Sequence, residues 1–286
     1  DGEHASWPVN ESNGKNINFY EENNFGTYKS YHVLGKHTDF FGTYWHDDQF
    51  GMVRYAPYDE KIGKKIWTWG LSKQGMNWEK MLTDTDGQYA EIQSGRLFNQ
   101  NAVGSSLTPF KHLGFVPHGT DKWTEYWYPV NHTKGMVVAN ASAALNIKWE
   151  NGWLKWYCSP VAFFIDELEI KLDGKSLLKR KIEAKPLQTL SDSIRMEKPS
   201  GKLSIALLQQ QLEWSSDPEF KTLSRPLDAP KPFDWTSADG LAIQAKELMD
   251  QKMFMEAGLK LKESLSKNPN GILGLVKSAE LEVRNG

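Results

Sequence analysis

The residue best suited to chemistry in this sequence is Glu91, which lies in an alternating run at 88–95. Successive side chains of a strand point to opposite faces, so Tyr89, Glu91 and Gln93 share one face. The phenol and the amide can orient the carboxylate, and an oriented carboxylate can act as a general acid or base. We predict Glu91 as a catalytic residue and Gln93 as a substrate contact. The alternative is an ordinary surface glutamate.

Two further candidates have acidic or aromatic neighbours. Glu125 lies between Trp123 and Trp127, and His46 precedes two aspartates. Two carboxylates that flank a glycosidic bond are the usual requirement of a glycoside hydrolase, which makes Glu125 the candidate partner of Glu91. The alternative for Glu125 is a plain cross-strand charge. His46 is predicted as a catalytic histidine held by a carboxylate, with a cation site at the aspartates or a polar loop tip as alternatives.

Four tryptophans lie in pairs beside these residues. Trp67 and Trp69 alternate along one predicted strand, and Trp123 and Trp127 lie on the same face of another. Aromatic rings stack on the apolar face of a sugar, while carboxylates and amides bind its hydroxyl groups. Large aromatic residues are also common in cores. Because each strand has two on one face, we expect at least one of the four to contact substrate.

The composition excludes several classes of function. With 34 Lys and Arg against 36 Asp and Glu, the net charge of -2 removes the electrostatic argument for nucleic acid or an anionic membrane. No apolar run has the length that spans a bilayer. Cys158 is the single cysteine, so an intrachain disulfide is excluded, and it is expected to be a small buried residue. Without a Gly-rich phosphate loop or metal-ligand spacing, we expect no cofactor and no metal. The sequence does not distinguish a cytoplasmic from a periplasmic location.

The elements that must position the candidates are predicted to be antiparallel strands over residues 1–150. Residues 63–95 are expected to form strand, turn and strand, because Gly87 can supply the positive φ of the turn. Ala90 and Ile92 are expected on the core face of the second strand. Residues 122–130 are predicted to form another strand.

After residue 150 the sequence pattern changes, first to short strands and a proline-rich segment and then to a helical period. Short strand candidates at 151–216 predict a small antiparallel sandwich, with 202–208 as a strand or a helix end, of which we favour the strand. Residues 217–236 contain four prolines and are predicted as a linker. Residues 237–286 have a helical period in which Leu241 and Ala245 recur as Leu275 and Ala279, 34 residues later. That spacing is the tetratricopeptide period.

The chain resembles a bacterial family in which a galactose-mutarotase-like supersandwich is fused to tetratricopeptide repeats. The resemblance rests on GKKIWTWG at 63–70, DTDGQYAEIQSGRLFNQ at 84–100, WTEYWYPV at 123–130, SRPLDAP at 224–230 and the repeats. It implies a mainly β protein with a twisted antiparallel sandwich whose concave face binds carbohydrate. It also implies a glutamate base on a late strand, which Glu91 matches best, with histidine as acid. The first half of that sandwich is expected before residue 1.

Together these observations predict a carbohydrate-active protein, namely a glycoside hydrolase or a related sugar-modifying enzyme. A non-catalytic glycan-binding module is the first alternative. The second is a scaffold whose tetratricopeptide repeats bind a protein partner. Carbohydrate is the predicted ligand in the first two cases.

Overall fold

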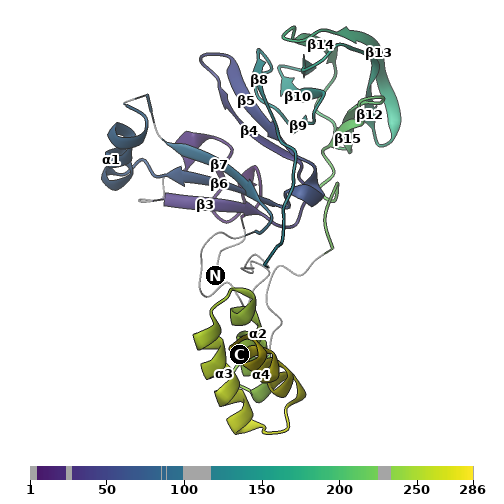
Figure 1. Ribbon diagram of the computed structural model, residues 1–286. Helices are drawn as coiled ribbons and strands as arrows, with labels where there is room; N and C mark the ends of the chain where they lie inside the picture. The colour runs from purple at the N-terminus through teal and green to yellow at the C-terminus, as the bar shows by residue number, and fades with distance from the viewer. Residues whose placement is uncertain are drawn as a thin grey trace. The chain divides into compact units, whose positions relative to one another are not determined.

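The computed structural model describes residues 5–23, 28–84, 86–87, 89–98, 117–224 and 233–285. It consists mainly of antiparallel β-sheets, followed by three C-terminal helices (Figure 1). Contacts divide the chain into two compact units. Unit 1 comprises Asp1–Leu34, Gly63–Asp121 and Ser224–Gly286, and unit 2 comprises Gly35–Ile62 and Lys122–Leu223. Within the described ranges, no helix is long and apolar enough to cross a membrane.

The main sheet of unit 1 has three antiparallel strands in the order β3-β6-β7. Their bounds are Tyr28–Val33, Gly63–Trp69 and Ala90–Gly95. Before them lie a short hairpin, β1 (Val9–Asn10) and β2 (Lys15–Asn16), and the 3-10 turn η1 (Tyr20–Glu22). The sequence predicted β6 and β7 but treated the region of β3 as loop and extended chain.

The connection between β6 and β7 is the helix α1 (Lys73–Leu82), not the simple turn that the glycines suggested. Ser72 caps the helix, because its hydroxyl accepts a hydrogen bond from the Gly75 amide at 3.3 Å. A Cβ at Gly75 would overlap the carbonyl oxygen of Gly70, so this glycine allows the helix to start close to the end of β6. The helix carries Trp78 back to the sheet.

The expectation that Ala90 and Ile92 of β7 are buried in the core is wrong. Ala90 is exposed and Ile92 is only half-buried. On the same sheet face, the buried residues come from β6 and are Lys64 and Thr68. Period two assigned the faces correctly, but it could not say which face the rest of the fold covers.

A second three-stranded sheet, in unit 2, has the order β4-β5-β8. Its strands are Phe40–Trp45, Phe50–Tyr55 and Tyr126–Asn131, and the 3-10 turn η2 is Tyr58–Glu60. The predicted strand at 122–130 therefore begins four residues late, because the chain before Tyr126 has no strand partner among the described residues. Val53 and Val130 point to the buried side, where they pack against Ala139 and Ala144.

The rest of unit 2 is a sandwich of two four-stranded sheets, ordered β14-β11-β10-β9 and β13-β12-β15-β16. The strands are β9 (Val138–Ala139), β10 (Ala143–Glu150), β11 (Trp153–Pro160), β12 (Phe164–Leu172), β13 (Lys175–Ala184), β14 (Leu190–Arg195), β15 (Leu203–Leu207) and β16 (Leu212–Ser215). Leu168 and Ile170, which alternate with charged residues along β12, are fully buried between the sheets. β15 confirms the strand at 202–208. Residue 150 ends β10 and lies next to the turn into β11, so 143–150 belong with the sandwich.

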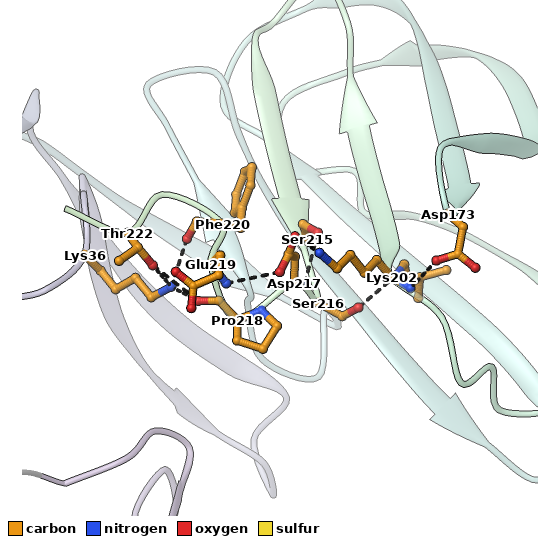
Figure 2. A network of polar contacts seen from close by, with 11 residues as sticks. Lys36, Asp173, Lys202, Ser215, Ser216, Asp217, Pro218, Glu219, Phe220 and Thr222 are labelled. Carbon is orange, nitrogen blue, oxygen red and sulfur yellow. Dashed lines mark hydrogen bonds and ion pairs between the residues drawn. The ribbon is translucent and has the colours of Figure 1, made fainter. Parts of the chain in front are cut away.

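The first part of the predicted linker is anchored to unit 2 (Figure 2). The Lys36 ammonium donates to the carbonyl of Pro218, to the carbonyl of Phe220 at 3.0 Å and to the hydroxyl of Thr222 at 2.7 Å. Asp217, which opens this segment, pairs with Lys202 at 2.7 Å. Residues 225–232, with the other three prolines, lie outside the described residues.

The helices are α2 (Ala238–Asp250), α3 (Phe254–Lys267) and α4 (Ile272–Asn285). Their core consists of Ala245, Met249, Ala257, Leu261 and Leu281. The 34-residue period also appears in the hydrogen bonds of the turns that precede α2 and α4. The Asp234 carboxylate accepts from the backbone amide of Thr236 at 2.9 Å, and the side-chain oxygen Oδ1 of Asn268, 34 residues later, accepts from the backbone amide of Asn270 at 3.2 Å. Both turns lead into a helix.

Candidate functional site

One face of the β3-β6-β7 sheet gathers the predicted residues of unit 1. The register places Trp67 between Ser30 and Glu91, and Lys65 between His32 and Gln93. Because alternate residues of a strand share a face, these side chains form one surface. We call it the sheet face, and its members are Tyr28, Ser30, His32, Lys65, Trp67, Trp69, Tyr89, Glu91 and Gln93.

Aromatic rings form a row along this face. Tyr28 stacks on Trp67 with ring centroids 4.5 Å apart, and Trp69 stacks on Trp78 of α1 at 4.6 Å. Trp67 and Trp69 meet edge to face at 5.9 Å. Tyr28 is 51% exposed, whereas Trp67 and Trp69 are partly buried beneath their neighbours. The ring that is most open to a ligand is therefore Tyr28, with the tryptophans supporting it.

Glu91 is held by its two neighbours on β7, as the sequence suggested. The Gln93 amide donates to one carboxylate oxygen of Glu91. Burial raises the pKa of Tyr89, and the charge of Glu91 and a hydrogen bond to it raise that pKa further. The protonated phenol donates to the carboxylate, because an ionised carboxylate can only accept. Glu91 thus has a fixed orientation on the face.

His32 and Lys65 add two nitrogen groups beside the carboxylate. Nδ1 of His32 lies 2.8 Å from the Phe98 carbonyl, and Nε2 lies 3.2 Å from the Ser30 hydroxyl. Burial lowers the pKa of His32, the Phe98 carbonyl opposes this, and the charge of Lys65 lowers it again. The imidazole is therefore neutral at neutral pH, with its proton on Nδ1, because a carbonyl can only accept. Burial also lowers the pKa of Lys65, and the charge of Glu91 opposes that shift.

A different arrangement surrounds Glu125 in unit 2. Its carboxylate receives two hydrogen bonds from Arg54, one of them 3.0 Å from Nε, and a third of 3.1 Å from the Trp127 indole. Lys61 lies 3.9 Å from the same carboxylate and 3.4 Å from the ring centre of Trp123. We call this group the Arg54–Glu125 cluster.

The charges of the cluster keep Glu125 ionised. Burial by itself would raise the pKa of Glu125, but hydrogen bonds from Arg54 and Trp127, with the charges of Arg54 and Lys61, lower it below its ordinary value. A carboxylate with a lowered pKa is a poor proton donor near neutrality. The geometry therefore assigns Glu125 to an ion pair that fixes the chain before β8, and Trp123 and Trp127 are exposed beside it.

His46 lies in the turn between β4 and β5. It is exposed, its carbonyl accepts from the Gln49 amide, and its ring meets Tyr44 edge to face at 5.1 Å. This placement fits the polar loop tip among the alternatives for His46. His112, which has no predicted role, is outside the described residues.

The structure therefore divides the predicted site residues between the two units. Trp67, Trp69, Glu91 and Gln93 share the sheet face in unit 1. In unit 2, Glu125 and Trp127 contact Arg54, and Trp123 lies against Lys61. Unit 2 also contains His46. Sequence reasoning missed Tyr28, His32, Lys65 and Trp78. The alternation of Tyr28, Ser30 and His32 was the available signal, but it is short and follows a region without periodicity.

Comparison with known proteins covers the part of the chain that contains both arrangements. No solved structure matches this chain. Residues 1–130, which include the sheet face and the Arg54–Glu125 cluster, are similar to the family DUF5107, a domain of unknown function.

Proposed function

We propose that the sheet face of unit 1 binds carbohydrate. The observation that carries this proposal is the exposed Tyr28 ring, stacked on Trp67, on the same surface as Glu91 and Gln93. An aromatic ring covers the apolar side of a sugar, and the carboxylate and amide can bind its hydroxyl groups. Ser30 adds a hydroxyl, which can both donate and accept.

The charges of the described part of the face favour a neutral sugar. Glu91 contributes one negative charge, Lys65 contributes one positive charge, and His32 is neutral at neutral pH because of its lowered pKa. Opposite charges on adjacent strands leave little net potential to attract an acidic or a basic ligand. Recognition would then depend on stacking and on hydrogen bonds.

We propose further that Glu91 exchanges protons with the bound sugar. Its orientation by Tyr89 and Gln93 suits a general acid or base. A hydrolase with paired carboxylates needs a second acid or base, and Glu125 is committed to Arg54. His32, neutral and on the same face, is the better partner for proton transfer. This favours a sugar-modifying enzyme of the epimerase type over a glycoside hydrolase, with a non-catalytic glycan-binding module as the alternative.

We also propose the finer fold assignments that the sequence suggests. The antiparallel sheets support a mutarotase-like supersandwich. The three helices and their 34-residue correspondence support tetratricopeptide repeats, which are available to a protein partner.

Binding can be tested by titration. Mono- to hexasaccharides of glucose, galactose, mannose and N-acetylglucosamine would be added while tryptophan fluorescence and calorimetric heat are followed. We expect saturable binding of at least one neutral glycan, with a change in fluorescence because Trp67 and Trp69 lie beneath the exposed ring. A flat response across this panel, in both signals, would argue against the carbohydrate proposal.

The position of the site can be tested with two matched variants. Tyr28→Ala and Trp127→Ala each remove a ring that is about half exposed on a strand, one from each unit. We expect Tyr28→Ala to weaken binding by roughly tenfold to a hundredfold, which corresponds to about 1.4–2.8 kcal/mol of contact free energy. Trp127→Ala should leave the affinity within about twofold, a change of less than 0.5 kcal/mol. The reverse result would move the site to unit 2. Circular dichroism checks that both variants fold.

A further inference from the structure

A cavity opens at one side of the sandwich in unit 2, between the edges of its two sheets. Its volume is about 280 Å³, and its lining comes from β11, β13 and β14. β13 is the last strand of one sheet and β14 is the last strand of the other. Neither strand has a neighbour on its outer side among the described residues, so this side of the sandwich is open. We call the space the edge cavity.

The side chain of Trp156 borders the edge cavity from the core of the sandwich. β11 is hydrogen-bonded to β10 on one side and to β14 on the other, so the backbone of Trp156 is already engaged. The residue is 2% exposed, and its Nε1 has no hydrogen-bond partner among the residues that the structure describes. An indole N–H can only donate, and buried donors in folded proteins normally have an acceptor. An acceptor atom inside the cavity would supply the missing partner.

An ion pair between the two edge strands forms the outer rim. Nε and Nη2 of Arg180 donate to Oδ2 of Asp192 at 3.1 and 2.9 Å. The other carboxylate oxygen, Oδ1, accepts from the amide of Ser193 at 2.8 Å. Both oxygens of Asp192 are therefore engaged, whereas Nη1 of Arg180 has no partner within the described part of the chain. The two side chains are 52% and 38% exposed, so a ligand can reach them from solvent.

The remaining lining adds positive charge and apolar surface. Glu183 pairs with Lys185 at 3.2 Å and takes no further part, while Lys181 forms no ion pair with a described residue. Ile182 and Leu190 line the cavity with aliphatic side chains, and Ile182 belongs to the core of the sandwich. The carboxylates at the cavity are thus engaged, and the groups still open to a ligand are donors. A ligand that fits must accept hydrogen bonds, carry negative charge and have an apolar part.

We propose that the edge cavity binds a carboxylate attached to an apolar chain. One carboxylate oxygen would accept from Nε1 of Trp156 and the other from Nη1 of Arg180, while the chain lies against Ile182 and Leu190. Hydrogen bonds to an ionised acceptor are stronger than those to a neutral one. A sugar hydroxyl fits less well, because its own proton would need an acceptor and those at the rim are engaged. The carboxylate can come from a free organic acid or from the C-terminus of a peptide. The site shares no residue with the sheet face and does not depend on the carbohydrate proposal.

The test follows the indole N–H of Trp156 directly. Triple-resonance spectra of the full chain assign its resonance, and hexanoate and hexanamide are then added in separate titrations. The two probes have the same chain and differ in the charge of the head group. We expect a saturable downfield shift with hexanoate and at least tenfold weaker binding of hexanamide, because the charged acceptor forms the stronger hydrogen bonds. No shift with hexanoate, or equal affinities for the two probes, would overturn the proposal and leave water as the partner of this donor.

Two matched variants test the position of the site. Arg180→Gln removes the guanidinium at the rim and leaves Asp192 to repel the ligand, so hexanoate should bind roughly tenfold to a hundredfold more weakly. Arg195→Gln changes an exposed arginine at the other end of β14, away from the cavity, and should keep the affinity within about twofold. Equal affinities in the two variants would overturn the assignment of Arg180.

A last comparison separates the two sources of the carboxylate. The tetrapeptide GAVL is titrated with a free and with an amidated C-terminus, beside hexanoate. Tighter binding of the free-acid peptide than of hexanoate, lost on amidation, makes a peptide terminus the source. Tighter binding of hexanoate makes a free organic acid the source. If neither the free-acid peptide nor hexanoate bound, the proposal would fail.

Discussion

Replacing Arg54 with methionine is expected to destabilise the protein by about 3 kcal/mol, the lower end of the cost of breaking a buried ion pair. The Arg54 side chain is 8% exposed and that of Glu125 is 19% exposed, so the variant leaves a largely buried carboxylate without its main partner. The guanidinium also lies 5.2 Å from the ring centre of Trp127, and this contact is lost as well. Urea unfolding followed by circular dichroism measures the effect.

The double variant Arg54→Met/Glu125→Leu is the matched control. It removes both charges and keeps apolar volume, so it should recover most of the lost stability. If the single and double variants were equally unstable, the loss would come from packing around the Arg54 stem. The interpretation of Glu125 as an ion-pair partner would then fail.

The same cluster predicts the direction of a pH effect. Because the pKa of Glu125 in the folded protein is lowered below its ordinary value, its ionised form stabilises the fold above that ordinary value. This contribution is lost as the pH falls through the lowered folded-state pKa. Unfolding free energies measured from neutral pH into this acidic range should therefore decline more steeply for the natural protein than for the double variant.

Local pattern predicted much of the fold. The alternation in 66–69 and 88–95 predicted β6 and β7, and the change to a helical period predicted α2, α3 and α4. The local pattern failed to predict features that depend on tertiary contacts. α1 depends on the close approach of Gly75 to Gly70, and the chain just before β8 is held by the hydrogen bonds that Arg54 donates to Glu125. Neither contact leaves a periodic signal in the sequence.

Like the fold, the candidate site was predictable only where the local sequence pattern determines it. Glu91, Gln93, Trp67 and Trp69 lie on one surface because period two places them there. Tyr28 and His32 could not be added, because only strand pairing brings β3 beside β6. The proposed pairing of Glu91 with Glu125 rested on similar aromatic flanks. Similar sequence neighbours could not show that the Glu125 carboxylate forms an ion pair with the buried Arg54.

Replacing Glu91 with glutamine is expected to lower turnover of the bound glycan by roughly two to four orders of magnitude, the range usual for loss of a general acid or base. Glutamine keeps the size of the side chain and can still meet Gln93 and Tyr89, but it cannot exchange a proton. Binding should change little, because ground-state contacts survive and the loss falls on kcat. Single-turnover rates and calorimetric affinity, measured on the same glycan, separate the two effects.

Two comparisons make this result specific to proton transfer at the sheet face. Glu183→Gln changes an exposed glutamate of β13 and should leave both turnover and affinity unchanged. Tyr89→Phe removes a hydrogen bond to Glu91 but no exchangeable carboxyl proton, so it should lower turnover less than Glu91→Gln and shift the pH optimum. Near-normal turnover in Glu91→Gln would exclude Glu91 as acid or base. Binding without turnover in the natural protein would instead make the sheet face a non-catalytic glycan site, in which Glu91 serves as a hydrogen-bond acceptor.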